Sequence, residues 1–409
     1  MKGFWPKAND KHKSNCLKCV CYNHSVNPRL PVTGKGSSGL MFIIDYPDKQ
    51  VDKNKQHHIS PKCDELRDVL GSHGVRLSDC FGLSAVHCVV PAGKESKLGL
   101  ACQCRGRSFK LIGETKPKVI IPLGTVPLDM LYGHRVGKLG GIHKWRGYAI
   151  PDRELGAWVV PALDQGTMEA NEQRSGLNVA RVLFKQDIAQ AIALINKPLP
   201  QGGDEESCCR ILQTPKQVER FLQKVISDEP PYIAFDYETT GLKPHRKGHK
   251  ILSCAIATSP TDSTAFMMDH ANLSLLKKIL RSKRIKKWAS NFKYEETWTR
   301  VLLGYGVIGW DFDTMIGAHV LDNSPGVTGL KFQAAVRYGV FGYDEEAKAY
   351  MQPKPIKTKK GLVEDKSDNA FNNLELFPVP KLLMYNAMDS LLEFRVAVDM
   401  KKEIKKASK

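Results

Sequence analysis

A short stretch between residues 197 and 206 divides the chain into two halves of different character. Its sequence, KPLPQGGDEE, is rich in proline, glycine and acidic residues, a composition typical of a connection between domains. At about 150 residues per domain, a chain of 409 residues corresponds to two or three domains. We therefore expect one domain over residues 1–197, a linker over 198–209 and a second domain over 210–409.

The chain is strongly basic. Its 61 Lys and Arg residues outnumber its 43 Asp and Glu residues, which gives a formal net charge of +18. This excess favours a polyanionic partner, with nucleic acid first and an anionic membrane second. There is no run of about 18 apolar residues, so no membrane-spanning helix is expected. Residues 1–7 lack the apolar core of a secretory signal, and we expect a cytoplasmic protein.

Both halves show strand-like and helical patterns. In the first half, apolar runs at 39–46, 82–90, 118–123 and 157–163 alternate with helical patterns at 62–71 and 125–132. This alternation predicts a parallel α/β sheet. In the second half, strand-like runs at 232–239, 250–257 and 263–268 precede a short strand at 286–290 and helical patterns at 272–284, 293–304, 313–321 and 381–405. That order resembles a ribonuclease-H-like sheet, and the polar stretch 351–373 is expected to be a loop or insertion.

Two acidic residues stand at the end of the first strand of the second half. Asp236 and Glu238 are two positions apart, so on a strand their side chains point to the same face. Two neighbouring carboxylates repel each other unless a cation lies between them. Hard divalent cations such as Mg²⁺ and Mn²⁺ prefer oxygen ligands, so the pair is a candidate metal site.

Two later segments extend this acidic set. The segment 290–298 contains Glu295 and Glu296 at the start of a helical pattern, and Tyr385 and Asp389 share one face of a later helix. The order of the three segments resembles the motifs of the DEDD 3′–5′ exonucleases of the tyrosine subclass, which include the proofreading domains of family A polymerases. Residues 313–315 and 321–322 are also similar to this family, and the resemblance covers residues 210–409.

The resemblance implies a chemistry and a role for each residue. Asp236, Glu238 and Asp389 would hold one catalytic Mg²⁺ or Mn²⁺, and Glu295 would support a second. Tyr385 would orient the attacking water, and the product would be a nucleoside 5′-monophosphate released from a 3′ end, especially that of single-stranded DNA. The family normally has Asp where this chain has the longer Glu295, and we expect activity to survive that change. Glu296 is expected to be an exposed neighbour.

Four cysteines of the first half are candidate ligands of a metal centre. Cys16 and Cys19 form a C-x-x-C pair, Cys88 follows a strand-like run, and Cys104 lies 16 residues later. A zinc site usually joins two close pairs, whereas these wide separations favour an iron–sulfur cluster; zinc and free thiols remain the alternatives. Cys102 is a rival ligand to Cys104.

The cysteine spacing resembles that of the iron–sulfur uracil-DNA glycosylases called family 4, over roughly residues 10–170. The family resemblance implies a [4Fe–4S] cluster on Cys16, Cys19, Cys88 and Cys104, and a parallel α/β sandwich. The active-site positions depart from the family: Tyr46 replaces a small residue of the pocket wall, and Asp164 stands in the segment where a His-Pro motif is expected. An Asp cannot stabilise a departing uracil anion, so we expect the fold to be kept and the glycosylase chemistry to be lost.

Together these patterns predict a two-domain replication protein. A degenerate glycosylase-like module that binds DNA or a partner precedes a two-metal 3′–5′ exonuclease, which proofreads or trims ends. Only 20 residues follow Asp389, so we expect the partner family A polymerase to be separately encoded, as it is beside similar phage exonucleases in an infected bacterium. The alternatives are a bifunctional repair enzyme with active uracil excision and a non-enzymatic DNA-binding scaffold of the replisome.

Overall fold

The computed structural model describes residues 16–93, 97–137, 139–200, 202, 205–358 and 361–408. The N-terminal segment 1–7, discussed above as lacking a signal, lies outside these residues, as does part of the predicted linker. The chain forms two compact units, one from Met1–Gln201 with Ala335–Phe341 and one from Gly202–Ala334 with Gly342–Lys409. In the described part of the chain, no helix is both long and apolar enough to cross a membrane.

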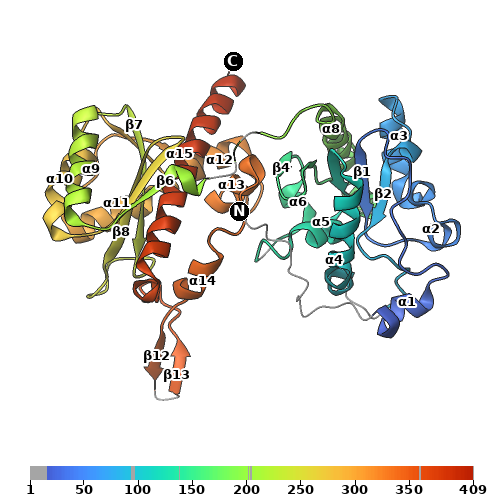
Figure 1. Ribbon diagram of the computed structural model, residues 1–409, viewed down its shortest axis with the longest axis horizontal. Helices are drawn as coiled ribbons and strands as arrows, with labels where there is room; N and C mark the ends of the chain where they lie inside the picture. Colours follow the sequence, from blue (N-terminus) through green and yellow to red (C-terminus); the bar gives the residue numbers. More distant parts are fainter. Residues whose placement is uncertain are drawn as a thin grey trace. The chain divides into compact units, whose positions relative to one another are not determined.

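The first unit is built on a sheet in the order β2-β1-β3-β5-β4, in which all described pairings are parallel except that of β4 with β5. Every residue of β1 is buried, as is typical of a parallel strand covered on both faces. Helix α5 packs on β1 and β3, and α8 packs on β3. Helix α4 packs on α5, and α3 packs on α8 (Figure 1). The predicted parallel α/β sandwich is therefore confirmed.

The elements of this unit have the following bounds. The strands are β1 (Leu40–Ile44), β2 (Phe81–Ser84), β3 (Val119–Pro122), β4 (Ile150–Asp152) and β5 (Ala157–Val159); the helices are α1 (Val20–His24), α2 (Lys49–Asn54), α3 (Asp64–Ser72), α4 (Lys97–Thr115), α5 (Thr125–Tyr132), α6 (Ile142–Trp145), α7 (Gln165–Ser175) and α8 (Val179–Ala193).

The second unit has a mixed sheet in the order β11-β10-β7-β8-β9-β6, with β8 antiparallel to both neighbours. Its strands are β6 (Cys209–Leu212), β7 (Tyr232–Thr239), β8 (Ile251–Ser259), β9 (Asp262–Met267), β10 (Lys286–Ala289) and β11 (Trp310–Asp313). Its helices are α9 (Pro215–Asp228), α10 (Leu273–Leu280), α11 (Lys293–Trp298), α12 (Thr314–Leu321), α14 (Glu345–Met351) and α15 (Val379–Ala407), while α13 (Leu330–Tyr338) begins in this unit. This order agrees with the predicted ribonuclease-H-like arrangement.

Alternation along β7 decides which side chains reach the functional face. Ile233, Phe235 and Tyr237 point into an apolar cluster with α9 and α10. The intervening Ala234 packs beside Phe394 of α15, so the even-numbered positions of the strand face that helix. Because α15 lies across β6, β7, β8 and β9 (Figure 1), the acidic residues of β7 point toward Asp389 of α15.

Two segments show detail that the sequence patterns do not specify. The stretch 351–373 contains a hairpin, β12 (Pro355–Thr358) paired with β13 (Gly361–Glu364), rather than only an irregular loop (Figure 1). The helical pattern at 293–304 is divided, because α11 ends at Trp298 and a π-helical turn, Thr299–Leu303, follows it. Neither change alters the position of the strand that carries Asp236 and Glu238.

Candidate active site

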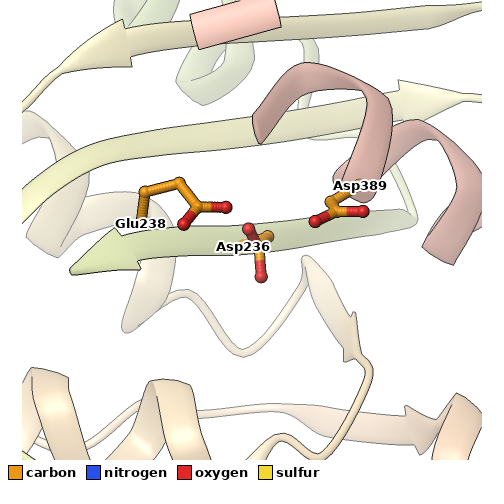
Figure 2. Close-up of side chains that lie close together, drawn as sticks. All are labelled: Asp236, Glu238 and Asp389. Atoms are coloured by element: carbon orange, nitrogen blue, oxygen red, sulfur yellow. The ribbon is translucent and has the colours of Figure 1, made fainter. Parts of the chain in front are cut away.

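Three of the predicted acidic residues meet on the α15 side of β7. Asp236 and Glu238 come from β7 and Asp389 from α15, and their side chains point toward one another (Figure 2). One carboxylate oxygen of each residue lies within 4.8 Å of the others. Three oxygen donors at this spacing form a suitable set of ligands for one hard divalent cation, so the donors present fit Mg²⁺ or Mn²⁺.

Hydrogen bonds hold two of these carboxylates in place. The Nδ2 of Asn386 donates to Oδ2 of Asp236 at 2.6 Å, while the Oγ of Ser253 donates to the other end of the Asn386 amide at 2.9 Å. The hydroxyl of Tyr343 donates to Oδ1 of Asp389 at 2.5 Å. These contacts leave the remaining carboxylate oxygens available to bind a cation.

A lysine accompanies the acidic group. The ammonium of Lys331 forms an ion pair with Asp389 and lies 4.7 Å from the centre of the Tyr385 ring. Desolvation and the charge of Asp389 raise the pKa of Asp236 well above its ordinary value, and Lys331 partly opposes that rise. Desolvation, then the charges of Asp236 and Asp389, raise the pKa of Glu238 in the same way.

Tyr385 lies one turn before Asp389 on α15, as predicted. It is 8% exposed, and its ring packs at 6.1 Å from that of Tyr343. Burial raises the pKa of its hydroxyl, and the charge of Asp389 raises it further. The hydroxyl is therefore neutral at ordinary pH and retains its proton for hydrogen bonding.

Glu295 is near the triad but is not part of it. It lies on α11, is 1% exposed, and its Oε2 has no hydrogen-bond partner among the described residues. Burial raises its pKa, and the charge of Asp236 raises it further. The turn that precedes α11 is held by Asp313, whose carboxylate accepts the backbone N–H groups of Asn291 and Phe292 at 3.0 Å each.

Glu296 is not the exposed neighbour expected from the sequence. Its carboxylate accepts the backbone N–H of Val307 at 3.0 Å and the indole N–H of Trp310 at 3.1 Å, and it pairs with Arg300. Since these contacts use both of its oxygens, Glu296 has a structural role at the end of α11.

Several functional candidates could not be read from the motifs. Lys331 and Tyr343 come from segments between the second and third motifs, where no residue pattern marks them. Asn386 adjoins Tyr385 in the third motif, but the motif pattern gives it no role. Glu393 continues the four-residue spacing of Tyr385 and Asp389 along α15, and that periodicity was the available signal.

The four predicted cysteine ligands lie close enough in the first unit to influence one another's pKa. Burial raises the pKa of the Cys104 thiol to about 11, and the charges of Cys88, Cys16 and Cys19 also raise it. The backbone N–H of Arg29 donates to Sγ of Cys88 at 3.3 Å, as is usual for cluster-binding thiolates. Cys102 points elsewhere: it is exposed and its Sγ contacts the carboxylate of Asp129 at 3.8 Å.

Thiolate sulfurs are the ligands of iron–sulfur clusters and of structural zinc ions. The four cysteines therefore supply a donor set that fits either kind of metal centre.

The carboxyl edge of the first sheet contains Tyr46 and Asp164, two positions at which the sequence departs from the glycosylase family. Tyr46 follows β1, and Nζ of Lys62 lies 3.4 Å from the centre of its ring and 2.6 Å from Oδ1 of Asp45. Asp164 caps α7 by accepting the backbone N–H of Thr167 at 2.9 Å. A lysine and a tyrosine therefore occupy the space beside β1, while Asp164 serves as a helix cap.

Sequence comparison confirms both resemblances. Residues 209–405 match the family model described as 3′–5′ exonuclease, so the second unit is similar to this family. The N-terminal part is similar to the type-4 uracil-DNA glycosylase of Pyrobaculum aerophilum, at 28% identity over 131 residues. That match covers 31% of this chain and 66% of the glycosylase.

Structure comparison finds several nucleases. Escherichia coli RNase D, described as an exoribonuclease involved in structured RNA processing, gives a TM-score of 0.36 at 16% identity over 49% of this chain and 46% of that chain. Brucella melitensis NrnC bound to pGG gives a TM-score of 0.34 at 16% identity, over 49% of this chain and 81% of that chain. The catalytic core of RRP6 from Trypanosoma brucei gives a TM-score of 0.36 at 16% identity, over 49% of this chain and 48% of that chain.

The raised carboxyl pKa values predict how the metal-free protein responds to pH. Above about pH 4, the unfolded state releases carboxyl protons that the folded state retains, because the folded pKa values are raised. The contribution of these groups to the free energy of unfolding is therefore fully present below that pH and is lost as the pH rises through the folded pKa values. In EDTA, the Tm of the transition that Mn²⁺ shifts should fall from pH 5 to pH 8. The fall in Tm should be smaller in Glu238→Gln, because the glutamine side chain cannot ionise. Each kcal/mol of lost unfolding free energy corresponds to a fall in Tm of about 2–4 °C. An equal fall in both proteins would contradict the assigned electrostatics.

Proposed function

We propose that this protein is a two-metal 3′–5′ exonuclease that acts on DNA 3′ ends and proofreads or trims for a separately encoded family A polymerase. The observation that carries this proposal is the triad of Asp236, Glu238 and Asp389, whose oxygens lie within 4.8 Å of one another in the unit that matches the exonuclease family. A solved structure of the similar NrnC from Brucella melitensis contains bound Mg²⁺, which supports the choice of cation.

Each side chain has a defined task in this proposal. Asp236, Glu238 and Asp389 hold one divalent cation, and Glu295 supports a second. When bound, the two ions lower the pKa of the attacking water and stabilise the leaving 3′ oxygen. Asn386 and Tyr343 keep Asp236 and Asp389 oriented through the hydrogen bonds described above. Tyr385 keeps its hydroxyl proton and orients the attacking water, and the product is a nucleoside 5′-monophosphate.

The first unit is proposed to be an inactive glycosylase-like module with a [4Fe–4S] cluster on Cys16, Cys19, Cys88 and Cys104. The contact between Lys62 and Tyr46 occupies space that a flipped base needs. The helix-capping Asp164 supplies no positive charge for a departing uracil. The net charge of +18 over the whole chain supports DNA as the ligand of the module, beside a contact with the polymerase.

Substitution of Asp236 tests the catalytic assignment. Asp236→Ala should lower the rate of 3′–5′ digestion of 5′-labelled single-stranded DNA in Mg²⁺ by about 10³-fold or more, because a ligand of the metal site is lost. Tyr385→Phe should cost about 10²-fold, since it removes one positioned hydroxyl. Glu375→Gln, a change of an exposed residue, is the control and should keep the wild-type rate. The rates on RNA of the same sequence and on DNA with a mismatched 3′ end measure the substrate preference. A wild-type rate in Asp236→Ala would show that the site is wrongly assigned.

Metal analysis tests the cysteine cluster. Anaerobically purified protein should be brown and contain about four irons per chain, because the four cysteines hold one cube. Cys104→Ser should lose the iron and lower the Tm, since ligand binding and folding are coupled, whereas the neighbouring Cys102→Ser should retain both. One zinc per chain without iron would refute the cluster.

Binding to uracil-containing DNA tests the first unit in a full-length Asp236→Ala background, which leaves the DNA intact. We expect equal Kd values for DNA with uracil or thymine, no free uracil, and a Kd that rises steeply with salt because phosphate neutralisation releases counterions. Release of free uracil would instead support the bifunctional repair enzyme.

A further inference from the structure

The connection between β7 and β8 carries a concentrated positive charge. Residues 240–250 contain no acidic residue, and six basic residues lie within the eight positions 243–250. His249 is buried, whereas the other five have exposed side chains and form a basic platform: Lys243, His245, Arg246, Lys247 and Lys250. Like charges this close together repel one another, so the platform is a surface that favours an anionic ligand.

Contacts around His249 give the platform a defined conformation. The ring of His249 stacks on that of Phe371 with the ring centroids 4.1 Å apart, and its Nδ1 lies 3.0 Å from Oγ1 of Thr240. The backbone N–H of Lys250 donates to Oγ1 of Thr240 at 2.9 Å, and the N–H of Thr240 donates to the carbonyl oxygen of Lys250 at 3.1 Å. These bonds close the base of the connection, so its basic side chains are presented together.

The insertion 351–373 packs against the same connection. Gly241 forms an antiparallel bridge with Phe371. The carboxylate of Asp365 lies 3.0 Å from the guanidinium of Arg246, and that of Asp368 lies 2.5 Å from the ammonium of Lys243.

Two lysines of the platform differ from Arg246 and Lys243 in this respect. Within the part of the chain that the structure describes, Lys247 and Lys250 form no ion pair, and both are exposed. Their two full positive charges are therefore available to an external anion.

The platform adjoins the metal-binding triad. Glu238 is the penultimate residue of β7, and Lys243 follows it by five residues, which span at most about 18 Å of extended chain. The residues at the two ends of the insertion, Met351 and Leu374, pack in the same apolar cluster as Tyr385. A nucleic-acid strand with its 3′ end at the triad can therefore place its next phosphates against the platform.

We propose that the basic platform binds the phosphate backbone of the substrate strand, on the 5′ side of the nucleotide that is removed. This inference rests on the exonuclease proposed above and adds a binding surface outside its metal site. Lys247 and Lys250 contact the phosphates, while the ion pairs with the insertion hold Arg246 and Lys243 in place. Phosphate contacts position a strand without reading its bases, so the platform accepts strands of any sequence.

Lysine acetylation of the full-length protein tests this surface, with single-stranded DNA of mixed sequence and with EDTA to prevent digestion. Bound DNA should slow the acetylation of Lys247 and Lys250, measured by mass spectrometry, because their ammonium groups lie against phosphates. Lys278 and Lys283 are the matched control, since both are exposed and lie on or just after α10, which packs on the sheet face opposite to the triad. Their acetylation should be equal with and without DNA.

Removal of the two charges gives a quantitative test. In the double variant Lys247→Gln and Lys250→Gln, the KM for digestion of this DNA in Mg²⁺ should rise about tenfold or more at about 0.1 M salt, and the slope of log KM against log salt should fall by about 1.4, or about 0.7 for each lost phosphate contact. The double variant Lys278→Gln and Lys283→Gln removes the same charge from the other face and should keep the wild-type KM and slope.

The outcomes separate this surface from the exonuclease itself. If the wild type digests the DNA but Lys247 and Lys250 are acetylated equally with and without it, the platform is overturned and the exonuclease proposal stands. An unchanged KM and salt slope in the Lys247→Gln and Lys250→Gln variant would overturn the platform as well. Protection of the two lysines in a protein that digests no DNA would support the platform and refute the exonuclease.

Discussion

Repulsion among neighbouring carboxylates is the constraint on which the second unit depends. Five acidic side chains from β7, α11 and α15 gather in one place, and all except the half-buried Asp236 are buried: Asp236, Glu238, Glu295, Asp389 and Glu393. Two like charges 4 Å apart repel by about 4 kcal/mol at an effective dielectric constant of 20. Among the described residues, Lys331 forms an ion pair with this group, through Asp389. The group is therefore compatible with folding when its members remain protonated or when cations bind between them.

Close packing of α15 on the sheet creates this constraint. Ala234 and Ala257 present small side chains to the helix, and Phe394 and Ala397 of α15 pack against them. Polar contacts reinforce the approach: the hydroxyl of Ser263 donates to the carbonyl oxygen of Ala387 at 2.8 Å. Helix and sheet cannot separate to relieve the charge repulsion without losing this buried interface. The packing of α15 on the sheet thus keeps the carboxylates close together although they repel one another.

The sequence revealed the parts of the site that have a local period. The run 232–239 agrees with β7, and the two-residue period placed Asp236 and Glu238 on one face. The four-residue period placed Tyr385 and Asp389 on one face of α15 in the same way. Lys331 and Tyr343 reach Asp389 through tertiary packing, which no spacing encodes. The hairpin within 351–373 was missed because its strands, Pro355–Thr358 and Gly361–Glu364, are short and lack the apolar alternation of a half-buried strand.

The edge strand β6 has a consequence for how the second unit can be cut from the chain. β6 pairs in parallel with β9 from Cys209 to Leu212, and just before it the carboxylate of Glu205 lies 3.3 Å from the guanidinium of Arg395. A fragment that begins after β6 would leave the backbone groups of β9 unpaired along the border of the sheet. Such a border recruits strands from other molecules. A fragment of the second unit that stays soluble therefore begins before Glu205, within the stretch that composition alone marks as a linker. A fragment that begins later is expected to aggregate.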